Sequence, residues 1–216
     1  MAGPLTPPLG EPVDHDADLR QRLASNLASH DRLHIDDPDL RHAAVAITVV
    51  AGETGAGFVL TRRSVGLRAH SHQYALPGGR LDDGETPPDA ARRELEEEVG
   101  VSTAHADVLG VLDDYRTRSG YIITPVVVWP GPDVRFQAQP AEVDQIFVIG
   151  LDELDRPDSP RWIDIEESDR PVLQLPLRNR LIHAPTGALL WQFREVAMHG
   201  RTVRLDAVEE PVWAWR

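Results

Sequence analysis

The sequence predicts an α/β protein in which strands precede and follow a central helix, with a further helix near the C-terminus. Three observations lead to this fold class. Short segments rich in Val and Ile are separated by turn residues over 43–149, an amphipathic segment spans 87–99, and a second helical pattern spans 186–199. A chain of 216 residues with 41% hydrophobic and 26% charged residues has the composition of one globular domain with a single main core.

The N-terminal part of the chain predicts a tail followed by a helix. Residues 1–16 contain four prolines and acidic residues with few large apolar side chains, so we expect a disordered tail. Leucines recur at every fourth position within 18–29, which predicts a short amphipathic helix. Residues 17–216 are expected to form a single domain whose core covers about 40–200.

The strands are predicted from short apolar runs bounded by turns. Residues 43–50 favour a buried strand, and the glycine-rich turn after them predicts a hairpin whose second strand covers 57–63. Further strands are expected at 74–76, 108–112, 121–129 and 145–149. Because Pro125 lacks a backbone donor, the strand that contains it is expected at a sheet edge or at a bulge.

The final helical pattern lies between a capping residue and a stop. Thr186 stands where a helix cap belongs, and Gly200 stands where the helix should end. We expect this C-terminal helix to cover the sheet.

Charge and composition exclude several classes of protein. Twenty-two Lys and Arg against 35 Asp and Glu give a net charge of −13, which repels phosphate backbones and predicts no nucleic-acid binding. The absence of cysteine excludes disulfides, thiolate metal sites and a cysteine nucleophile. The longest apolar run, 43–51, is far shorter than the ~20 residues that span a bilayer, so no membrane contact is expected. The first 18 residues lack the pattern of a secretory signal, which predicts a cytoplasmic protein.

The segment 79–101 contains the most informative pattern. Thr86 is a suitable N-cap, Pro87 suits the first helical turn, and Gly100 suits the helix end. On this helix Ala91, Leu95 and Val99 form an apolar stripe, while the carboxylates of Glu94, Glu97 and Glu98 share one arc beside it. At ~100° per residue, Glu96 points away from that arc and is expected to be solvated.

Three carboxylates on one helix face repel one another, so a cation is expected to neutralise them. Mg²⁺ binds a few carboxylates and waters and shares its remaining positions with substrate phosphates. The pattern therefore indicates a metal site that processes phosphates. The alternative is an acidic helix face that is simply solvated.

The same segment resembles the signature of the Nudix hydrolases. That signature reads Gly, five residues, Glu, seven residues, then Arg-Glu-apolar-x-Glu-Glu-x-Gly-apolar. The residues at its fixed positions are Gly79, Glu85, Arg93, Glu94, Leu95, Glu97, Glu98, Gly100 and Val101. The resemblance implies a Nudix hydrolase domain over 17–216 with an α/β/α sandwich and a mixed β-sheet.

The resemblance also implies roles for particular residues. Mg²⁺ or Mn²⁺ would be bound by the Gly78 carbonyl and by Glu94, Glu97 and Glu98, and Glu94 or Glu98 would orient or deprotonate the attacking water. Gly79, Glu85 and Arg93 would be supporting residues, the last two through a charge pair.

A further acidic ligand is expected downstream. Glu142 stands before an apolar strand, in the setting where many Nudix relatives carry an additional acid, and it would join the metal site. The alternative for this residue is a solvated loop position.

Upstream, residues 59–79 resemble the additional motif of the Nudix coenzyme A diphosphatases. The residues that fit are Leu60, Thr61, Arg63, Ser64, Arg68, Pro77, Gly78 and Gly79, whereas Val59, His72 and Leu76 depart from the motif. The resemblance implies that Arg63 and Arg68 bind substrate phosphates, the alternative being ordinary surface arginines. The implied substrate is coenzyme A or a derivative, and the products would be 3′,5′-ADP and 4′-phosphopantetheine.

Other interpretations stay open at this stage. The substrate could be an oxidised nucleoside triphosphate, ADP-ribose or NADH, or the domain could be a non-catalytic ligand-sensing module. His70 and His72 could act on a substrate phosphate or be solvated loop residues. Trp213 and Trp215 indicate strand packing or the contact of a homodimer, with stacking on an adenine as a third alternative.

Overall fold

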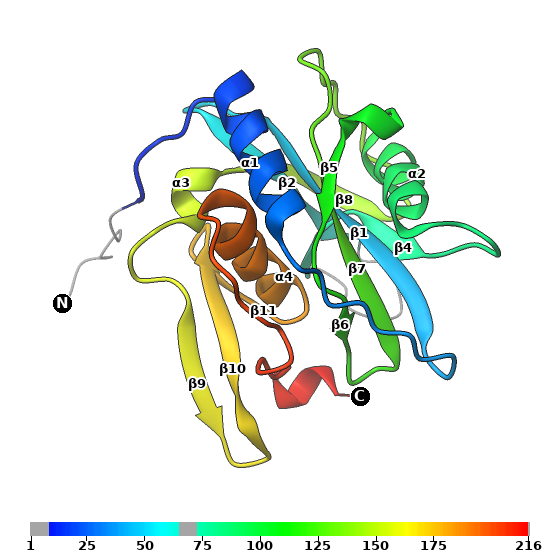
Figure 1. Cartoon of the computed structure of the whole chain (residues 1–216), viewed down its shortest axis with the longest axis vertical. Helices are drawn as coiled ribbons and strands as arrows, with labels where there is room; N and C mark the ends of the chain where they lie inside the picture. Colours follow the sequence, from blue (N-terminus) through cyan, green and yellow to red (C-terminus); the bar gives the residue numbers. More distant parts are fainter. Residues whose placement is uncertain (1–8, 65–72, 216) are drawn as a thin grey trace.

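The computed structural model describes residues 9–64 and 73–215 and shows a mixed sheet packed between helices (Figure 1). In this part of the chain the main sheet has the strand order β3-β2-β1-β7-β5, with β8 beside β2, β4 beside β1 and β6 beside β7. Its strands are β1 (Arg41–Ala51), β2 (Ala56–Arg63), β3 (Tyr74–Ala75), β4 (Gly78–Arg80), β5 (Val108–Val111), β6 (Tyr115–Arg116), β7 (Tyr121–Val128) and β8 (Val143–Gly150).

Helices cover both faces of this sheet. They are α1 (Ala17–Ser29), α2 (Pro87–Val99), α3 (Leu151–Leu154) and α4 (Thr186–Gln192), and α4 continues as a π-helical segment over Phe193–Met198. Short 3₁₀ turns lie at His105–Asp107 and Val212–Ala214. No helix in the described part of the chain is both long and apolar enough to cross a bilayer.

The side chains of β1 show why two helical layers form. Ala44 and Ala46 point to one face, where they pack with Leu95 of α2. Ile47 points to the other face, where it joins the large core that includes Leu23 of α1. Since β1 and β7 are parallel while the other pairs of the main sheet are antiparallel, the predicted α/β/α sandwich with a mixed sheet is confirmed.

The local predictions over the first half of the chain agree with the structure. Helix α1 buries Leu19, Leu23 and Leu27, as their spacing predicts, and Asp16 caps its first turn. Strands β1 and β2 form the expected antiparallel hairpin, with Val49 opposite Phe58.

The edge position expected for the strand with Pro125 is wrong. Strand β7 lies inside the sheet, with β1 on one side and with β6 and β5 on the other. Pro125 falls between the positions paired with β6 and those paired with β5, and its carbonyl accepts from the Leu112 N–H at 3.0 Å. The missing donor of proline is therefore tolerated at the gap between two short partner strands.

Two further features were not predicted. A small antiparallel sheet is formed by β9 (Arg161–Ile165), β10 (Ser168–Leu177) and β11 (Arg180–His183). The described end of the expected tail contacts the domain, since the Gly10 N–H donates to the Asp152 carbonyl and the Val13 carbonyl accepts from Ala56. Gly10 and Val13 therefore contact the folded domain, which the composition of this segment does not predict.

The C-terminal helix begins and ends near the expected residues. Its N-cap position is Pro185 rather than Thr186, and no side chain caps it. The chain leaves the helical segment at Gly200, whose φ of +65° is the left-handed conformation that favours glycine.

Candidate active site

Helix α2 carries the glutamates of the candidate site. The Thr86 side chain accepts from the Asp89 N–H at its start, and Gly100 ends it with a φ of +73°. The stripe of Ala91, Leu95 and Val99 is buried against the sheet, which fixes the rotation of the helix about its axis.

That rotation places the four glutamates in different surroundings. Glu98 is only 4% exposed, and Glu94 is half-buried. Glu97 and Glu96 are both exposed. The predicted arc therefore runs from the protein interior at Glu98 to solvent at Glu97.

Two glycines of β4 allow the backbone to approach these carboxylates. A Cβ atom on Gly79 would clash with the Glu94 carboxylate, and one on Gly78 would clash with the Ala44 carbonyl of β1. The Gly78 backbone also makes a hydrogen bond to the Glu98 carboxylate. The Pro-Gly-Gly sequence thus brings the main chain of β4 into contact with the glutamates of α2.

Arg93 joins this loop to the helix. Its Nε donates to Glu85 Oε1 at 2.9 Å and its Nη2 donates to Glu85 Oε2 at 3.0 Å, so the expected charge pair is present. Nη2 also donates to the Arg80 carbonyl at 3.0 Å. The hydrogen bond from Arg93 lowers the pKa of Glu85, which keeps this support charged.

The causes of the pKa shift of Glu98 show which groups lie around it. Burial raises its pKa to about 8, the positive charge of Arg63 opposes this shift, and the negative charges of Glu94 and Glu142 add to it. Burial also raises the pKa of Glu94, again with a contribution from Glu142. Glu94, Glu98, Glu142 and Arg63 therefore lie within electrostatic reach of one another.

Glu142 reaches this group from the start of β8. It is exposed, and its carbonyl accepts from the Ser64 N–H at 2.8 Å, next to the irregular pairing of β2 with β8. Arg63 ends β2 on the same side of the sheet. Arg68, His70 and His72 lie outside the described residues.

The chemistry of these residues fits a divalent metal ion, although their present arrangement does not form a closed ligand set. Among residues 9–64 and 73–215, no group of three or more acidic or histidine side chains is arranged to hold an ion. Arg93 Nη1 donates to Glu94 at 2.8 Å and to Glu97 at 3.2 Å, so a cation already contacts two of the predicted ligands. The carboxylates of Glu94 and Glu98 have raised pKa values, and the group offers only oxygen ligands. A hard cation would stabilise the charged form of such carboxylates.

A long cleft lies beside β4. Its inner part, a cavity of about 400 Å³, is lined by Arg63, Gly78, Gly79, Tyr121 and Trp213 among others. A second cavity of about 640 Å³ shares Gln73, Tyr74, Ala184, Pro185, Thr186 and Trp213 with the first, and it extends to Arg62, Arg180 and His183. The two cavities therefore adjoin. We refer to them together as the cleft, with the first, beside the Gly-Gly backbone, as its inner half and the second as its outer half.

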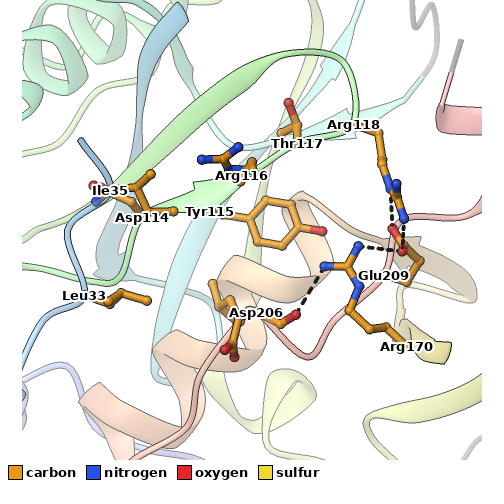
Figure 2. A pocket seen from close by; sticks show the side chains of 11 residues that line it. Leu33, Ile35, Asp114, Tyr115, Arg116, Thr117, Arg118, Arg170, Asp206 and Glu209 are labelled. Carbon is orange, nitrogen blue, oxygen red and sulfur yellow. Dashed lines mark hydrogen bonds and ion pairs between the residues drawn. The ribbon is translucent and has the colours of Figure 1, made fainter. Parts of the chain in front are cut away.

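The C-terminal segment forms one wall of this cleft, and Figure 2 shows part of what holds it. Glu209 lies between Arg118 and Arg170, which donate to it at 3.1 Å (Nε) and 2.6 Å (Nη2), and Ser168 donates at 2.8 Å. Burial opposes ionisation of Glu209, yet these hydrogen bonds lower its pKa to about 2. These ion pairs border a separate cavity of about 260 Å³.

Sequence reasoning missed most of the cleft wall. Trp213 was singled out for its place near the C-terminus, but nothing local indicated that it faces a cavity beside β4. Tyr121 and Arg180 carried no signal, because their nearness to the cleft depends on the pairing of β7 with β1 and of β11 with β10.

Comparison with known proteins identifies the family. The NUDIX domain model matches residues 40–175, which is more than half of the chain, and the chain belongs to this family. Nudix hydrolases generally use divalent ions such as Mg²⁺ or Mn²⁺.

Similar curated proteins bear the name "Uncharacterized Nudix hydrolase NudL". The protein from Escherichia fergusonii is 42% identical, and that from Escherichia coli K12 is 41% identical, each over 112 residues. Each match covers 51% of this chain and 58% of the relative, so the chain matches little more than half the length of these relatives.

Solved structures show weaker similarity. The Nudix hydrolase RenU of M. smegmatis is 19% identical with a TM-score of 0.49, covering 76% of this chain and 89% of its own. The NUDIX domain of Shewanella oneidensis NrtR, solved with ADP ribose, is 21% identical with a TM-score of 0.44, covering 62% and 87%. The family assignment rests on the family model and not on these structures.

Proposed function

We propose that this protein is a divalent-metal-dependent Nudix hydrolase that cleaves the P–O–P bond of a nucleoside diphosphate linked to another moiety. One observation carries the proposal. The buried Glu98 and the half-buried Glu94 of α2 lie within electrostatic reach of Glu142 and Arg63, beside a cleft whose inner end is the Gly-Gly backbone of β4. A solvated acidic helix face would not bury Glu98 to 4% exposure, so that alternative is disfavoured.

The proposed metal ligands are the Gly78 carbonyl and the carboxylates of Glu94, Glu97, Glu98 and Glu142. When bound, Mg²⁺ or Mn²⁺ would offset charge on the diphosphate and lower the pKa of the attacking water. Glu94 or Glu98, which lie against the backbone of Gly79 and Gly78, would take the proton of that water as the general base.

The remaining residues position these groups. Arg93 and Glu85 fix the loop after β4 to α2, and Gly79 leaves room for the Glu94 carboxylate. Arg63, beside Glu98 and at the inner end of the cleft, neutralises a phosphate of the nucleotide, and we assign the same task to Arg68.

Coenzyme A or a derivative is the proposed substrate. The motif over 59–79 supports it, and so does a cleft long enough to continue from the Gly-Gly backbone past Trp213 to Arg180. The products would be 3′,5′-ADP and 4′-phosphopantetheine. We further propose that residues 17–216 act as one cytoplasmic domain and that the protein is a homodimer, which light scattering during size-exclusion chromatography would test.

A substrate panel tests the function. Purified protein with Mg²⁺ or Mn²⁺ would be given coenzyme A, ADP-ribose, NADH and an oxidised nucleoside triphosphate, and product masses would locate the cleaved bond. We expect coenzyme A to have the highest kcat/KM. Faster hydrolysis of another nucleotide would reject coenzyme A and keep the mechanism, whereas binding without hydrolysis of any substrate would favour a ligand-sensing module.

A further inference from the structure

The outer half of the cleft has a different character from the half beside the glutamates. The inner half begins at Gly78 and Gly79, next to the proposed diphosphate chemistry. The outer half continues past Trp213 to the hairpin that joins β10 and β11. A substrate whose diphosphate lies at the Gly-Gly backbone would therefore place its attached group in the outer half.

Trp213 stands where the two halves meet. It lines both cavities and is 56% exposed, and its ring meets the His183 ring edge-on at a centroid distance of 5.6 Å. A tryptophan that only packs the core would be buried, as the fully enclosed Phe193 is. The nearby Trp215 differs, because its side chain has partners within the protein. Its Nε1 donates to the Glu210 carbonyl and its ring lies under Arg118.

The backbone that carries Trp213 is held in place by hydrogen bonds on both sides of it. Arg118 and Arg170 fix Glu209 four residues before it (Figure 2), and the Arg118 N–H donates to Glu210 Oε1 at 2.8 Å. The Ala214 N–H closes the following turn on the Pro211 carbonyl. Because this backbone is already ordered, stacking of a planar ligand on Trp213 has only the side chain left to order.

Arg180 supplies a free positive charge at the same place. It is exposed at the first position of β11 and lines the outer half, and it makes no ion pair with the residues that the structure describes. Arg62, the other arginine of this half, is already neutralised by Asp144 at 2.6 Å. Arg63 is not available for a distant group, because its charge acts on Glu98.

We propose that the outer half of the cleft binds a nucleoside that carries an additional phosphate, with the base stacked on Trp213 and that phosphate bound by Arg180. Stacking on an indole and a charge-assisted contact from a guanidinium are the interactions that such a group offers. The inference rests on the proposed function and names the substrate feature that the same cleft would recognise. For coenzyme A, that feature is the 3′-phosphate.

Equilibrium binding tests the inference without depending on turnover. Isothermal titration calorimetry in EDTA would compare 3′,5′-ADP with 5′-AMP, which lacks only the additional phosphate. We expect Arg180→Ala to weaken the binding of 3′,5′-ADP by about tenfold and to leave the binding of 5′-AMP nearly unchanged. Trp213→Ala should weaken the binding of both nucleotides by about tenfold, whereas Trp213→Phe should keep most of the wild-type affinity.

Two variants serve as matched controls. Arg135 is exposed, lines neither half of the cleft and has no ion-pair partner among the described residues, so Arg135→Ala should bind both nucleotides as the wild type does. Trp162 is 43% exposed on β9 beside Trp191, so Trp162→Ala should also keep both affinities.

Hydrolysis assays separate this inference from the proposed function. We expect Arg180→Ala to reduce the preference for coenzyme A over dephospho-coenzyme A by about tenfold. An unchanged preference, with unchanged 3′,5′-ADP binding, would overturn the inference while leaving the hydrolase intact. A wild type that binds 3′,5′-ADP through both side chains but cleaves no diphosphate would overturn the proposed function and keep the binding site.

Discussion

Glu98 and Glu209 are both buried glutamates, and the protein treats them in opposite ways. Glu98 is 4% exposed and Glu209 is 1% exposed. Burial raises the pKa of Glu98 to about 8, with Glu94 and Glu142 adding to the shift. Burial also opposes ionisation of Glu209, yet bonds from Arg118, Ser168 and Arg170 hold its pKa at about 2.

The difference shows that burial alone does not identify a functional carboxylate. A buried carboxylate with two arginines already has its counter-charge, so it stabilises the fold. Around Glu98 the positive charge of Arg63 stands against two further carboxylates, Glu94 and Glu142, so the free energy of this group falls when a cation binds. The comparison therefore supports the role proposed for Glu98, whereas Glu209 holds the C-terminal segment.

The largest expected effect is on turnover. Glu98→Gln should lower kcat on the order of a hundredfold or more, because the amide neither accepts the proton of the water nor ligates the ion as a carboxylate does. The fold should survive, since Gln has nearly the shape of Glu and carries no charge that burial penalises. Steady-state kinetics at saturating Mg²⁺, together with a thermal melt, would check both statements, and near-normal turnover would refute the metal assignment.

Metal binding gives the next largest effect. Mg²⁺ should raise the melting temperature, because it binds the folded protein and offsets repulsion among the carboxylates. The added free energy of unfolding is about 2.7 kcal/mol when the free Mg²⁺ concentration is 100 times Kd. Differential scanning fluorimetry with and without Mg²⁺ would measure the shift. Glu209→Gln should keep the shift and Glu98→Gln should lose most of it; a shift of equal size in both variants would place the ion elsewhere.

Glu209→Gln should destabilise the fold by about 2 kcal/mol, since it leaves two arginines without their charged partner. Urea unfolding would measure the loss. Glu166→Gln is the control, because Glu166 is an exposed residue of the turn between β9 and β10 with no ion pair in the described structure. Equal stability of the two variants would contradict the structural role of Glu209.

The same two residues should give opposite pH dependences in metal-free protein. The folded pKa of Glu98 lies above its ordinary value of 4.5, so the folded state binds the proton more tightly and loses stability as pH rises from about 4.5 to 8. The folded pKa of Glu209 lies below 4.5, so its contribution is complete above that pH and is lost as pH falls towards 2.

Free energies of unfolding in EDTA across this pH range would check the signs. Glu98→Gln should remove the decline between pH 5 and 8, and Glu209→Gln should remove part of the acid sensitivity. A Glu98→Gln curve parallel to that of the wild type would show that Glu98 ionises normally.

Local sequence predicted the region around Glu98 but not the region around Glu209. The caps Thr86 and Gly100, the apolar stripe and the glutamates of α2 lie within one short segment, so spacing alone predicted the helix and its acidic arc. Glu209 instead meets Arg170 and Arg118 across 39 and 91 positions, and such pairs depend on the whole fold. The sheet of β9, β10 and β11 was missed for a different reason. Its hairpins are local, but β10 contains two prolines and neither turn contains the glycine that typically signals a hairpin.

The smallest expected effect belongs to Glu96, which lies on the same helix as Glu98 but outside the arc. It is exposed, and its side chain makes no hydrogen bond or ion pair with the described residues, as its helical angle predicts. Glu96→Ala should therefore leave kcat, the Mg²⁺ dependence and the melting temperature close to those of the wild type. Kinetics over a Mg²⁺ titration would measure kcat and the Mg²⁺ dependence, and a thermal melt would give the melting temperature. A loss of kcat comparable to that of Glu98→Gln would show that the ion is bound by the charge of the whole helix and not by one face of it.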